Sequence, residues 1–369
     1  MNNTQQVQAI LEKYVEAEYR TMLLSICETI GITRLARLTK FDKTPIETWS
    51  ACRPHAMLWQ VSAGKGLTER NALISCIMES YESYSSEQYL RGSYIYSSPP
   101  DSVAKADMDE IIRESKKLLG EDIKCPKSFE MWIPALELKS NAMKYVPLHW
   151  AFLCSDATKL GWVTNGLAAG KEAVDAREHG IYELIERHYL SACIKNGALD
   201  QSAFNYIPLE QINLRTNYLL STLDKDLKPH FLCIKDSPIP TVWCILLDNS
   251  PPTTNLYVNF GSKSHVEVED AIIGSFTEAC QQRASQIQGT REDLSQSVPL
   301  FDPKIIKKLK LFINSVERID LDHVSCDKSK DLFMHLPGTV YEIVLPMQIP
   351  GVMSAKYIAP AAYFNRGLF

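Results

Sequence analysis

Three segments of the sequence place acidic or amide side chains at one shared spacing. They read Ser75-x-x-x-Glu79-x-x-Glu82, His179-x-x-x-Glu183-x-x-Glu186 and Gly274-x-x-x-Glu278-x-x-Gln281. On a helix, positions i, i+4 and i+7 fall within roughly 60° of one another, so each segment would present two side-chain oxygens on one stripe. An alanine stands seven residues before each first glutamate, at Ala72, Ala176 and Ala271. The copies lie roughly 100 residues apart, too far for a solenoid, so we expect three similar helices in one domain.

If these helices converge, they gather five carboxylates and one amide. Such a density of negative charge is stable only with cations or many hydrogen bonds. Mg²⁺ takes oxygen ligands, and in nucleotide sites it is held by a few carboxylates together with phosphates. The predicted Mg²⁺ ligands are Glu79, Glu82, Glu183, Glu186, Glu278 and Gln281.

Basic residues flank the same segments, which a simple metal-storage site would not need. They are Lys65 before the first segment, Arg187 after the second, and Arg283 and Arg291 after the third. Lysine and arginine are phosphate-binding groups by type. The Gly- and Ala-rich run 165–170 is suited to presenting backbone N–H groups to an anion at a helix N-terminus. The pattern indicates ATP with Mg²⁺, although P-loop, kinase and Rossmann motifs are absent.

The competing interpretation of the glutamates is a solvated helix face. An isolated E-x-x-E pair usually lies on the surface, because glutamate is a favoured residue of exposed helices. Here, however, the glutamates interrupt stretches that are otherwise apolar or small, over 72–82 and 271–281. A carboxylate in a buried helix needs a compensating partner, so these stretches favour a functional site.

The elements that would position these residues are helices and strands interspersed along the chain. Apolar residues at helical spacing predict an N-terminal helix over 1–30, which Gly31 ends. Apolar, β-branched runs predict strands at 241–248 and 339–346. Gly, Pro and Ser break the pattern within 91–130, which we predict to be a surface excursion. The remainder, 31–369, is predicted to be one mixed α/β domain, with three internally similar helices around a central ATP and Mg²⁺ site.

The composition is that of a globular protein and lacks the features of nucleic-acid-binding, secreted and membrane proteins. The 369 residues are 45% hydrophobic, enough for a large core, and 39 basic against 44 acidic residues give no basic excess for nucleic acid. The N-terminus lacks the features of a secretory signal, and no run reaches about 18 uncharged apolar residues. We therefore expect a cytoplasmic protein that binds neither nucleic acid nor a membrane. The ten cysteines form no C-x-x-C pair and are expected to be reduced and mostly buried.

Taken together, the motifs resemble those of the YcaO-domain family. The family motif S-x-x-x-E-x-x-E-R is similar to 75–83, with Ser83 where the family usually has arginine. N-G-x-A-x-G followed by E-x-x-E-R is similar to 165–170 and 183–187, and E-A-x-Q-x-R is similar to 278–283. The similarity runs from about residue 31 to about residue 291. Segments 31–34, 38–42, 53–54 and 64–66 look most like the branch of the family associated with TfuA proteins.

The resemblance implies ATP-dependent modification of a ribosomally synthesised peptide. In the family a nucleophile adds to an amide carbonyl, the oxygen takes the γ-phosphate of ATP, and phosphate leaves, giving an azoline, thioamide or amidine. Phosphorylation makes a poor leaving group a good one, and the enzyme supplies position and charge. Carried over by position, the implied ATP contacts are Lys65, Ser75, Asn165, Arg187, Arg283, Arg34 and Arg291. The residues expected to be catalytic are Glu183, Arg187 and Arg283.

Two departures from the family refine this expectation. The chain ends in Ala362 to Phe369 and not in the P-x-P-x-P tail of many azoline-forming members, which favours thioamide formation with an external sulfide source. No segment of about 80 to 90 residues precedes the motifs to bind a leader peptide, so we expect a TfuA-like or E1-like partner beside the precursor peptide; a homodimer is also allowed. The alternatives are a catalytically inactive YcaO-like scaffold within a modification complex and a nucleotide-free carboxylate-bridged metal protein.

Overall fold

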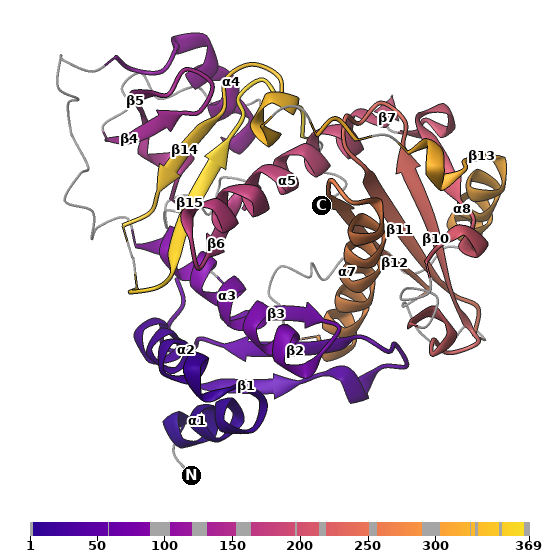
Figure 1. The fold of residues 1–369 in the computed structure, drawn as a ribbon, viewed down its shortest axis with the longest axis horizontal. Coiled ribbons are helices and arrows are strands. Elements are labelled where there is room, and N and C mark those ends of the chain that lie inside the picture. Colours follow the sequence, from indigo (N-terminus) through magenta and orange to yellow (C-terminus); the bar gives the residue numbers. More distant parts are fainter. Residues whose placement is uncertain are drawn as a thin grey trace. The chain divides into compact units, whose positions relative to one another are not determined.

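The structure is a computed structural model of the chain. It describes residues 3–57, 59–88, 104–119, 131–152, 164–195, 198–213, 219–250, 257–289, 303–324, 326–328, 331–346 and 349–364. Helices and strands alternate along the chain, which confirms the predicted mixed α/β fold (Figure 1). Most of the expected excursion over 91–130 lies outside the described residues, and the part within them contains helix α4 (Met108–Leu119). Among the described residues no helix is both long and apolar enough to cross a membrane.

The N-terminal segment forms two helices where one was predicted. Helix α1 (Asn3–Tyr14) and helix α2 (Ala17–Ile30) are separated at Val15 and Glu16. Arg20 donates from Nε to the carbonyl of Val15 at 2.7 Å and from Nη2 to a carbonyl one turn earlier at 3.1 Å. These bonds satisfy carbonyls that the broken helix leaves without a partner. No Pro or Gly marks the break, so the periodicity did not reveal it. Gly31 ends α2 as predicted, with φ 75°.

The chain forms two compact units, which are described separately. Unit 1 comprises Met1–His55, Trp59–Ser80 and Tyr189–Lys328, and unit 2 comprises Ala56–Leu58, Tyr81–His188 and Ser329–Phe369. The boundaries after residues 80 and 188 fall inside helix α3 (Glu69–Glu87) and helix α5 (Ala173–Ala192). The sequence carries no sign of this division, because no linker composition accompanies it.

Unit 1 contains a three-stranded antiparallel sheet and a five-stranded sheet. The first has the order β1 (Arg34–Arg37), β2 (Glu47–Cys52), β3 (Val61–Gly66). The second has the order β12 (Val258–Ser264), β11 (Thr241–Asp248), β10 (Leu227–Ile234), β9 (Phe204–Ile207), β13 (Glu317–Arg318). Helix α7 (Val268–Gln288) runs along β12 and β11 (Figure 1). The core between them is apolar, with Phe231 of β10 against Phe276 of α7 at 6.4 Å between ring centroids.

The smaller elements of unit 1 complete its surface. They are β7 (Ile194–Lys195), β8 (Ala198–Leu199), α8 (Pro303–Ser315) and the 3₁₀ helices η1 (Thr39–Phe41), η5 (Gln201–Ala203), η6 (Leu209–Gln211) and η7 (Leu321–His323). The predicted strand at 241–248 is confirmed as β11.

Unit 2 is built on a five-stranded sheet. Its order is β5 (Ala142–Pro147), β4 (Trp132–Glu137), β14 (Tyr341–Val344), β15 (Met353–Ile358), β6 (Leu167–Gly170). Two 3₁₀ helices, η3 (Leu148–Trp150) and η8 (Leu332–His335), also belong to this unit. Helix α5 follows β6, and α4 contributes Ile111 to the apolar core of this sheet. The predicted strand at 339–346 contains β14.

The three predicted helices exist, and each follows a strand. They are α3 after β3, α5 after β6 and α7 after β12. In two of these strand–helix pairs a strand glycine stands six residues before the alanine of the helix, Gly66 before Ala72 and Gly170 before Ala176. A Cβ at Gly66 would lie 2.5 Å from the amide nitrogen of Ala72, and one at Gly170 would lie 2.6 Å from that of Ala176. Because only glycine permits so close an approach, these glycines allow α3 and α5 to pack directly on the strands before them.

Candidate nucleotide and metal site

Two predicted Mg²⁺ ligands of unit 2 are held by backbone amides. Glu82 Oε1 accepts a hydrogen bond from the N–H of Ala169 at 2.7 Å. Glu183 Oε2 accepts one from the N–H of Gly166 at 2.9 Å. Both donors belong to the run 165–170, which was predicted to present backbone amides to an anion. A carboxylate oriented through one oxygen can direct its other oxygen to a ligand, which is how supporting groups prepare a metal site.

Arg187 lies between the two glutamates of helix α5. Its Nη2 is 3.6 Å from Glu183 Oε1, and its Nε is 3.7 Å from Glu186 Oε1. Glu186 is buried, with 4% of its surface exposed. A buried carboxylate requires a compensating charge, and the arginine that follows it in the predicted motif supplies one. Asn165 directly precedes the amide that binds Glu183, so these motif residues come together in unit 2.

A buried lysine, Lys356, stands near the same glutamate and was not found from the sequence. Burial lowers the pKa of Lys356 to about 8, while the charges of Glu183 and Glu114 act in the opposite direction. Lys356 is 4% exposed on β15, opposite Leu167 of β6. The next amide of β15 donates to the carbonyl of Gly166 at 2.7 Å. The signal was a single charged residue within the run 353–358, which otherwise has no charge.

In unit 1, helix α7 is fixed to strand β12 in a similar way. Glu278 Oε2 accepts from the N–H of Ser262 at 3.1 Å, and Gln282 Oε1 accepts from the N–H of Phe260 at 2.6 Å. Gln281 is buried, with 9% of its surface exposed. Glu79 of α3 is exposed. The predicted metal ligands therefore range from buried to exposed, which a uniformly solvated face does not explain.

One face of the β1–β2–β3 sheet, called the polar face below, carries four polar residues beside Ala36, Cys52, Val61 and Ala63. Thr48, Ser50 and Cys52 are alternate residues of β2. Thr48 is paired with Lys65 of β3, and Cys52 is paired with Arg34 of β1. Paired residues and alternate residues share a face of a sheet, so Arg34, Thr48, Ser50 and Lys65 lie on one side. Gln288 of α7 donates from Nε2 to Ser50 Oγ at 2.9 Å, which places this side against α7.

The first repeated segment meets the same sheet at strand β3. The backbone N–H of Lys65 donates to Ser75 Oγ at 3.3 Å, so two predicted ATP contacts adjoin. The two basic residues of the face, Lys65 and Arg34, are the kind of groups that bind phosphate.

Several polar atoms of β2 and α7 fit a polar ligand. Thr48 Oγ1, Ser285 Oγ and Gln288 Oε1 are buried and have no hydrogen-bond partner among the described residues. Thr48 is fully buried and Ser285 is 1% exposed. Buried polar groups without partners are rare in native proteins, so such atoms point to a bound polar molecule or water. The carboxylate and amide oxygens are hard donors of the type that Mg²⁺ takes. The residues present therefore fit ATP and Mg²⁺.

Arg283, predicted to contact ATP, is engaged by two carboxylates. Its Nε donates to Asp42 Oδ1 at 2.8 Å, and its Nη2 is 2.9 Å from Asp248 Oδ2. The residue is 5% exposed. Arg291 lies outside the described residues, so its predicted role is not examined by the structure.

The predicted site residues are distributed over both units. Unit 1 holds Arg34, Lys65, Ser75, Glu79, Glu278, Gln281 and Arg283, and unit 2 holds Glu82, Asn165, Glu183, Glu186 and Arg187. Within the described ranges no three acidic, histidine or cysteine side chains gather closely enough to bind a metal by themselves. Convergence of the three helices on one site remains a prediction, and any Mg²⁺ would be shared between a few of these carboxylates and phosphate oxygens.

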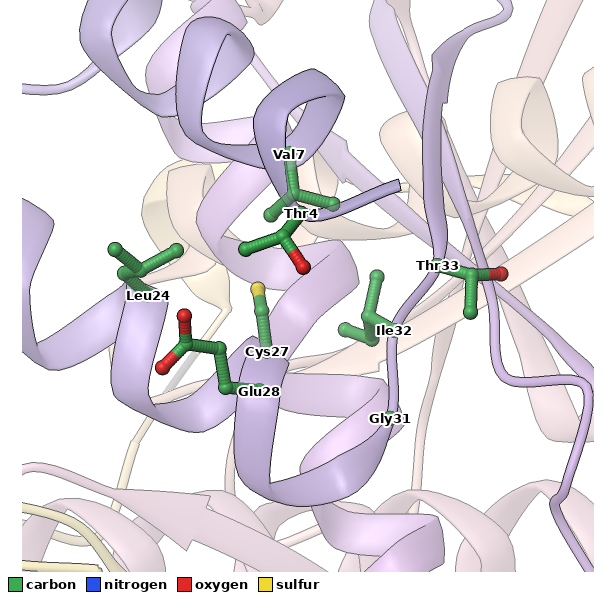
Figure 2. A pocket seen from close by; sticks show the side chains of 8 residues that line it. All are labelled: Thr4, Val7, Leu24, Cys27, Glu28, Gly31, Ile32 and Thr33. Carbon is green, nitrogen blue, oxygen red and sulfur yellow. The ribbon is translucent and has the colours of Figure 1, made fainter. Parts of the chain in front are cut away.

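A pocket of about 330 Å³ opens elsewhere, between α1, α2 and the start of β1 (Figure 2). None of the predicted site residues lines it; its lining consists of Thr4, Val7, Leu24, Cys27, Glu28, Gly31, Ile32 and Thr33. Burial raises the pKa of Cys27 to about 12, so its thiol stays protonated and is a poor nucleophile. The eight described cysteines are free, and six of them are buried, as expected.

Comparison with known proteins decides the family. The model of the family described as "YcaO cyclodehydratase, ATP- and Mg²⁺-binding" matches residues 63–332. The chain belongs to the YcaO family. ATP and Mg²⁺, indicated by the repeated glutamates and their basic neighbours, are the cofactors of this family.

Two curated relatives agree with the YcaO assignment and with its branch. An uncharacterized protein of Methanothermobacter thermautotrophicus is 29% identical over 72% of the chain and 68% of its own length. An uncharacterized protein in the tfuA 3′ region of Rhizobium leguminosarum bv. trifolii is 25% identical over 76% of the chain and 66% of its own length. The chain thus spans about two thirds of these relatives. The second relative supports the predicted TfuA-associated branch.

Solved YcaO structures share the fold. YcaO from Methanopyrus kandleri, bound with AMPPCP and Mg²⁺, has a TM-score of 0.68 at 18% identity, covering 97% of this chain and 91% of that one. A heterocyclase in complex with substrate and cofactor has a TM-score of 0.63 at 17% identity, covering 99% and 52%. The E. coli microcin synthetase McbBCD complex with pro-MccB17 bound gives 0.62 at 13%, covering 90% and 88%. These likenesses establish the YcaO fold.

Proposed function

We propose that this YcaO protein uses ATP to activate an amide of a ribosomally synthesised peptide by O-phosphorylation. The observation that carries the proposal is the backbone anchoring of one glutamate on each repeated helix: Glu82 by Ala169, Glu183 by Gly166 and Glu278 by Ser262. A surface glutamate has no need of such a bond, whereas a metal ligand gains a fixed orientation from it.

In this proposal all three repeated helices contribute residues that bind ATP and Mg²⁺. The Mg²⁺ ligands are Glu79, Glu82, Glu183, Glu186, Glu278 and Gln281, and the ATP contacts are Arg34, Lys65, Ser75, Asn165, Arg187, Arg283 and Arg291. ATP, when bound, supplies the phosphoryl group that turns the amide oxygen into a leaving group. The protein's own task is to hold acidic and basic groups in place so that charge is balanced where it develops.

For the product we favour a thioamide over an azoline. The support is the TfuA-associated branch. The solved heterocyclase has a bound substrate and the solved microcin synthetase complex has bound pro-MccB17, which supports a peptide substrate here. A TfuA-like partner would then bring the precursor peptide or the sulfur donor, and an E1-like partner is the alternative.

The test is phosphate release from ATP in the presence of Mg²⁺ and a candidate precursor peptide, to be sought among the products of neighbouring genes. Glu183→Gln keeps an oxygen to accept the Gly166 N–H but removes the negative charge, so turnover should fall by about 100-fold or more. Glu178→Gln is the matched control, because Glu178 is an exposed glutamate on the same helix.

Undiminished turnover in Glu183→Gln would refute the assigned role. A wild-type protein that binds peptide and ATP without releasing phosphate would support the inactive scaffold instead. Mass spectrometry of the peptide then separates the products, since oxygen-to-sulfur exchange raises the mass and ring formation removes one water.

A further inference from the structure

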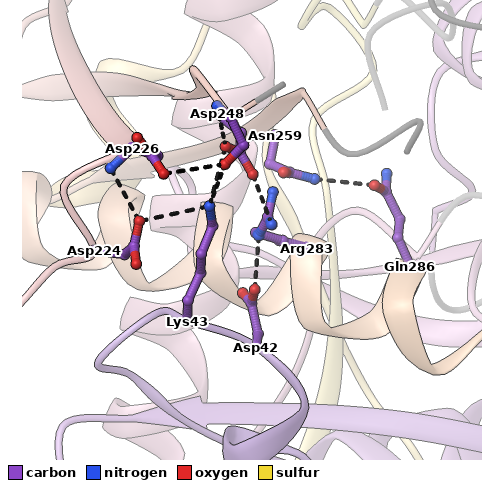
Figure 3. Close-up of polar contacts among 9 residues, drawn as sticks. Asp42, Lys43, Asp224, Asp226, Asp248, Asn259, Arg283 and Gln286 are labelled. Carbon is purple, nitrogen blue, oxygen red and sulfur yellow. Dashed lines mark hydrogen bonds and ion pairs between the residues drawn. The ribbon is translucent and has the colours of Figure 1, made fainter. Parts of the chain in front are cut away.

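Arg283 is one member of a chain of alternating charges within unit 1 (Figure 3). Arg283 lies between Asp42 and Asp248, at 2.8 and 2.9 Å. Lys43 Nζ lies 3.2 Å from Asp248 Oδ1 on the other side. Lys43 is also 3.6 Å from Asp224, which precedes β10. We call the four residues Asp42, Arg283, Asp248 and Lys43 the ion-pair chain.

The two ends of the ion-pair chain are neighbours in the sequence. Asp42 and Lys43 follow η1 in the connection between β1 and β2, whereas Asp248 ends β11 and Arg283 belongs to α7. Two consecutive residues therefore contact the Arg283–Asp248 pair, Asp42 through Arg283 and Lys43 through Asp248. The side chains of Asp42, Arg283 and Asp248 are 2%, 6% and 7% exposed.

The ion-pair chain is electrically balanced, with two positive and two negative groups. Burial alone would raise the pKa of Asp248, but hydrogen bonds from Ser250 and Lys43 and the charge of Arg283 hold it below its usual value. The carboxylate is therefore ionised at neutral pH. Because two carboxylates engage Arg283, its orientation is fixed at two of its nitrogens. A buried ion pair adds little net stability compared with apolar packing, which favours a role in orientation.

The connection that carries Asp42 and Lys43 belongs to the sheet that bears Arg34, Thr48 and Lys65. Helix α7 bears Glu278 and Gln281. The sheet is tied to α7 twice, through Asp42 to Arg283 and through Ser50 to Gln288. The two α7 residues are five positions apart, or about 7.5 Å along the helix axis. Two hydrogen bonds at separate positions along α7 restrict both its translation and its rotation relative to the sheet.

We infer that Asp42 is a positioning residue, which acts through Arg283 and with Lys43 to set the polar face of the β1–β2–β3 sheet against the Glu278 turn of α7. The inference rests on the proposed function, because it assigns these two surfaces to one nucleotide site. Asp42 does not touch the nucleotide; it sets the place of the residues that do.

The test is the affinity for AMPPCP with Mg²⁺, measured by calorimetry, which requires neither the peptide nor the partner. Asp42→Asn keeps the shape and removes the charge, and it should raise Kd by about tenfold or more. Asp322→Asn removes the same charge from an exposed aspartate of unit 1 and should leave Kd unchanged. If Asp42 acts through Arg283, the double variant Asp42→Asn/Arg283→Gln should bind no more weakly than Arg283→Gln alone.

Each outcome bears on the inference. Equal Kd values for wild type and Asp42→Asn would overturn it, as would tighter binding, which would make Asp42 a competitor of phosphate for Arg283. Additive effects in the double variant would also overturn it. A wild-type protein that does not bind AMPPCP would overturn the proposed function and this inference together. If Asp42→Asn does not fold, Lys43→Met is the variant that tests the inference. It should raise Kd by about threefold, and an unchanged Kd would refute the inference.

Discussion

Replacement of Lys356 by methionine should stabilise the protein at neutral pH. The ordinary pKa of 10.5 falls to about 8 because the ammonium group is buried in β15. That difference corresponds to about 3 kcal/mol. At a pH where the lysine is charged in both the folded and the unfolded state, its burial lowers the free energy of unfolding by this amount. Methionine has a similar length and no charge, so Lys356→Met should raise the free energy of unfolding by up to about 3 kcal/mol at pH 7. The gain is reduced by the favourable interaction of the lysine charge with Glu114 and Glu183, which the variant lacks.

The sign of the pH dependence follows from the two pKa values. Below pH 8 the lysine is protonated in both states, and the cost is present in full. Between pH 8 and 10.5 the folded protein releases the proton while the unfolded chain keeps it, so the cost shrinks as the pH rises. At pH 10 it should be about 1 kcal/mol. The advantage of the methionine variant should therefore be large at pH 7 and small at pH 10.

Urea unfolding at these two pH values, followed by circular dichroism, measures both quantities. Buried cysteines and tyrosines also titrate in alkali, but they are common to both proteins and cancel in the difference. Lys171→Met, at an exposed position of unit 2, is the control and should change the free energy of unfolding by less than about 0.5 kcal/mol. The reasoning is refuted if Lys356→Met is less stable than wild type at pH 7, or if its advantage does not decrease toward pH 10.

Two further predictions concern unit 1. Gly261→Ala should destabilise it by about 1–3 kcal/mol in urea unfolding, because the new Cβ would lie 2.2 Å from the carbonyl oxygen of Ser275. Gly274→Ala, where the new Cβ would lie 2.6 Å from Cγ of Lys263, should destabilise it less, because a side chain shifts more readily than the main chain. Burial, helped by nearby lysines, lowers the pKa of His230 from 6.5 to about 4, so the stability that its neutral form provides is lost as the pH falls through this range. The decrease in unfolding free energy between pH 7 and pH 5 should thus be smaller in His230→Gln by about 2 kcal/mol, and equal slopes would contradict the assignment.

The sequence predicted those features that depend on local spacing. The i, i+4, i+7 pattern identified three helices, and α3, α5 and α7 carry it. In two copies the alanine seven residues before the first glutamate lies against a strand glycine, Ala72 against Gly66 and Ala176 against Gly170. Such contacts repeat in the sequence because each lies within one strand-to-helix unit.

Features that join distant parts of the chain were not accessible. Asp42 and Arg283 are 241 residues apart, and a single sequence contains no information on which aspartate an arginine meets. The break at Val15 was missed because the residue that stabilises it, Arg20, is a good helix former. The division into two units was missed because its boundaries lie inside helices, where composition does not change.

The amides that orient Glu82, Glu183 and Glu278 belong to the main chain at Ala169, Gly166 and Ser262. No exchange of side chain removes a main-chain N–H, except exchange for proline. At Ala169 and Ser262 a change of side chain other than to proline therefore leaves the orienting N–H in place. Gly166 differs, because its φ of 76° and the 2.3 Å between a new Cβ and the carbonyl oxygen of Tyr357 exclude a side chain there. An alanine scan would therefore show backbone strain at Gly166, whereas only proline would test the N–H groups of Ala169 and Ser262.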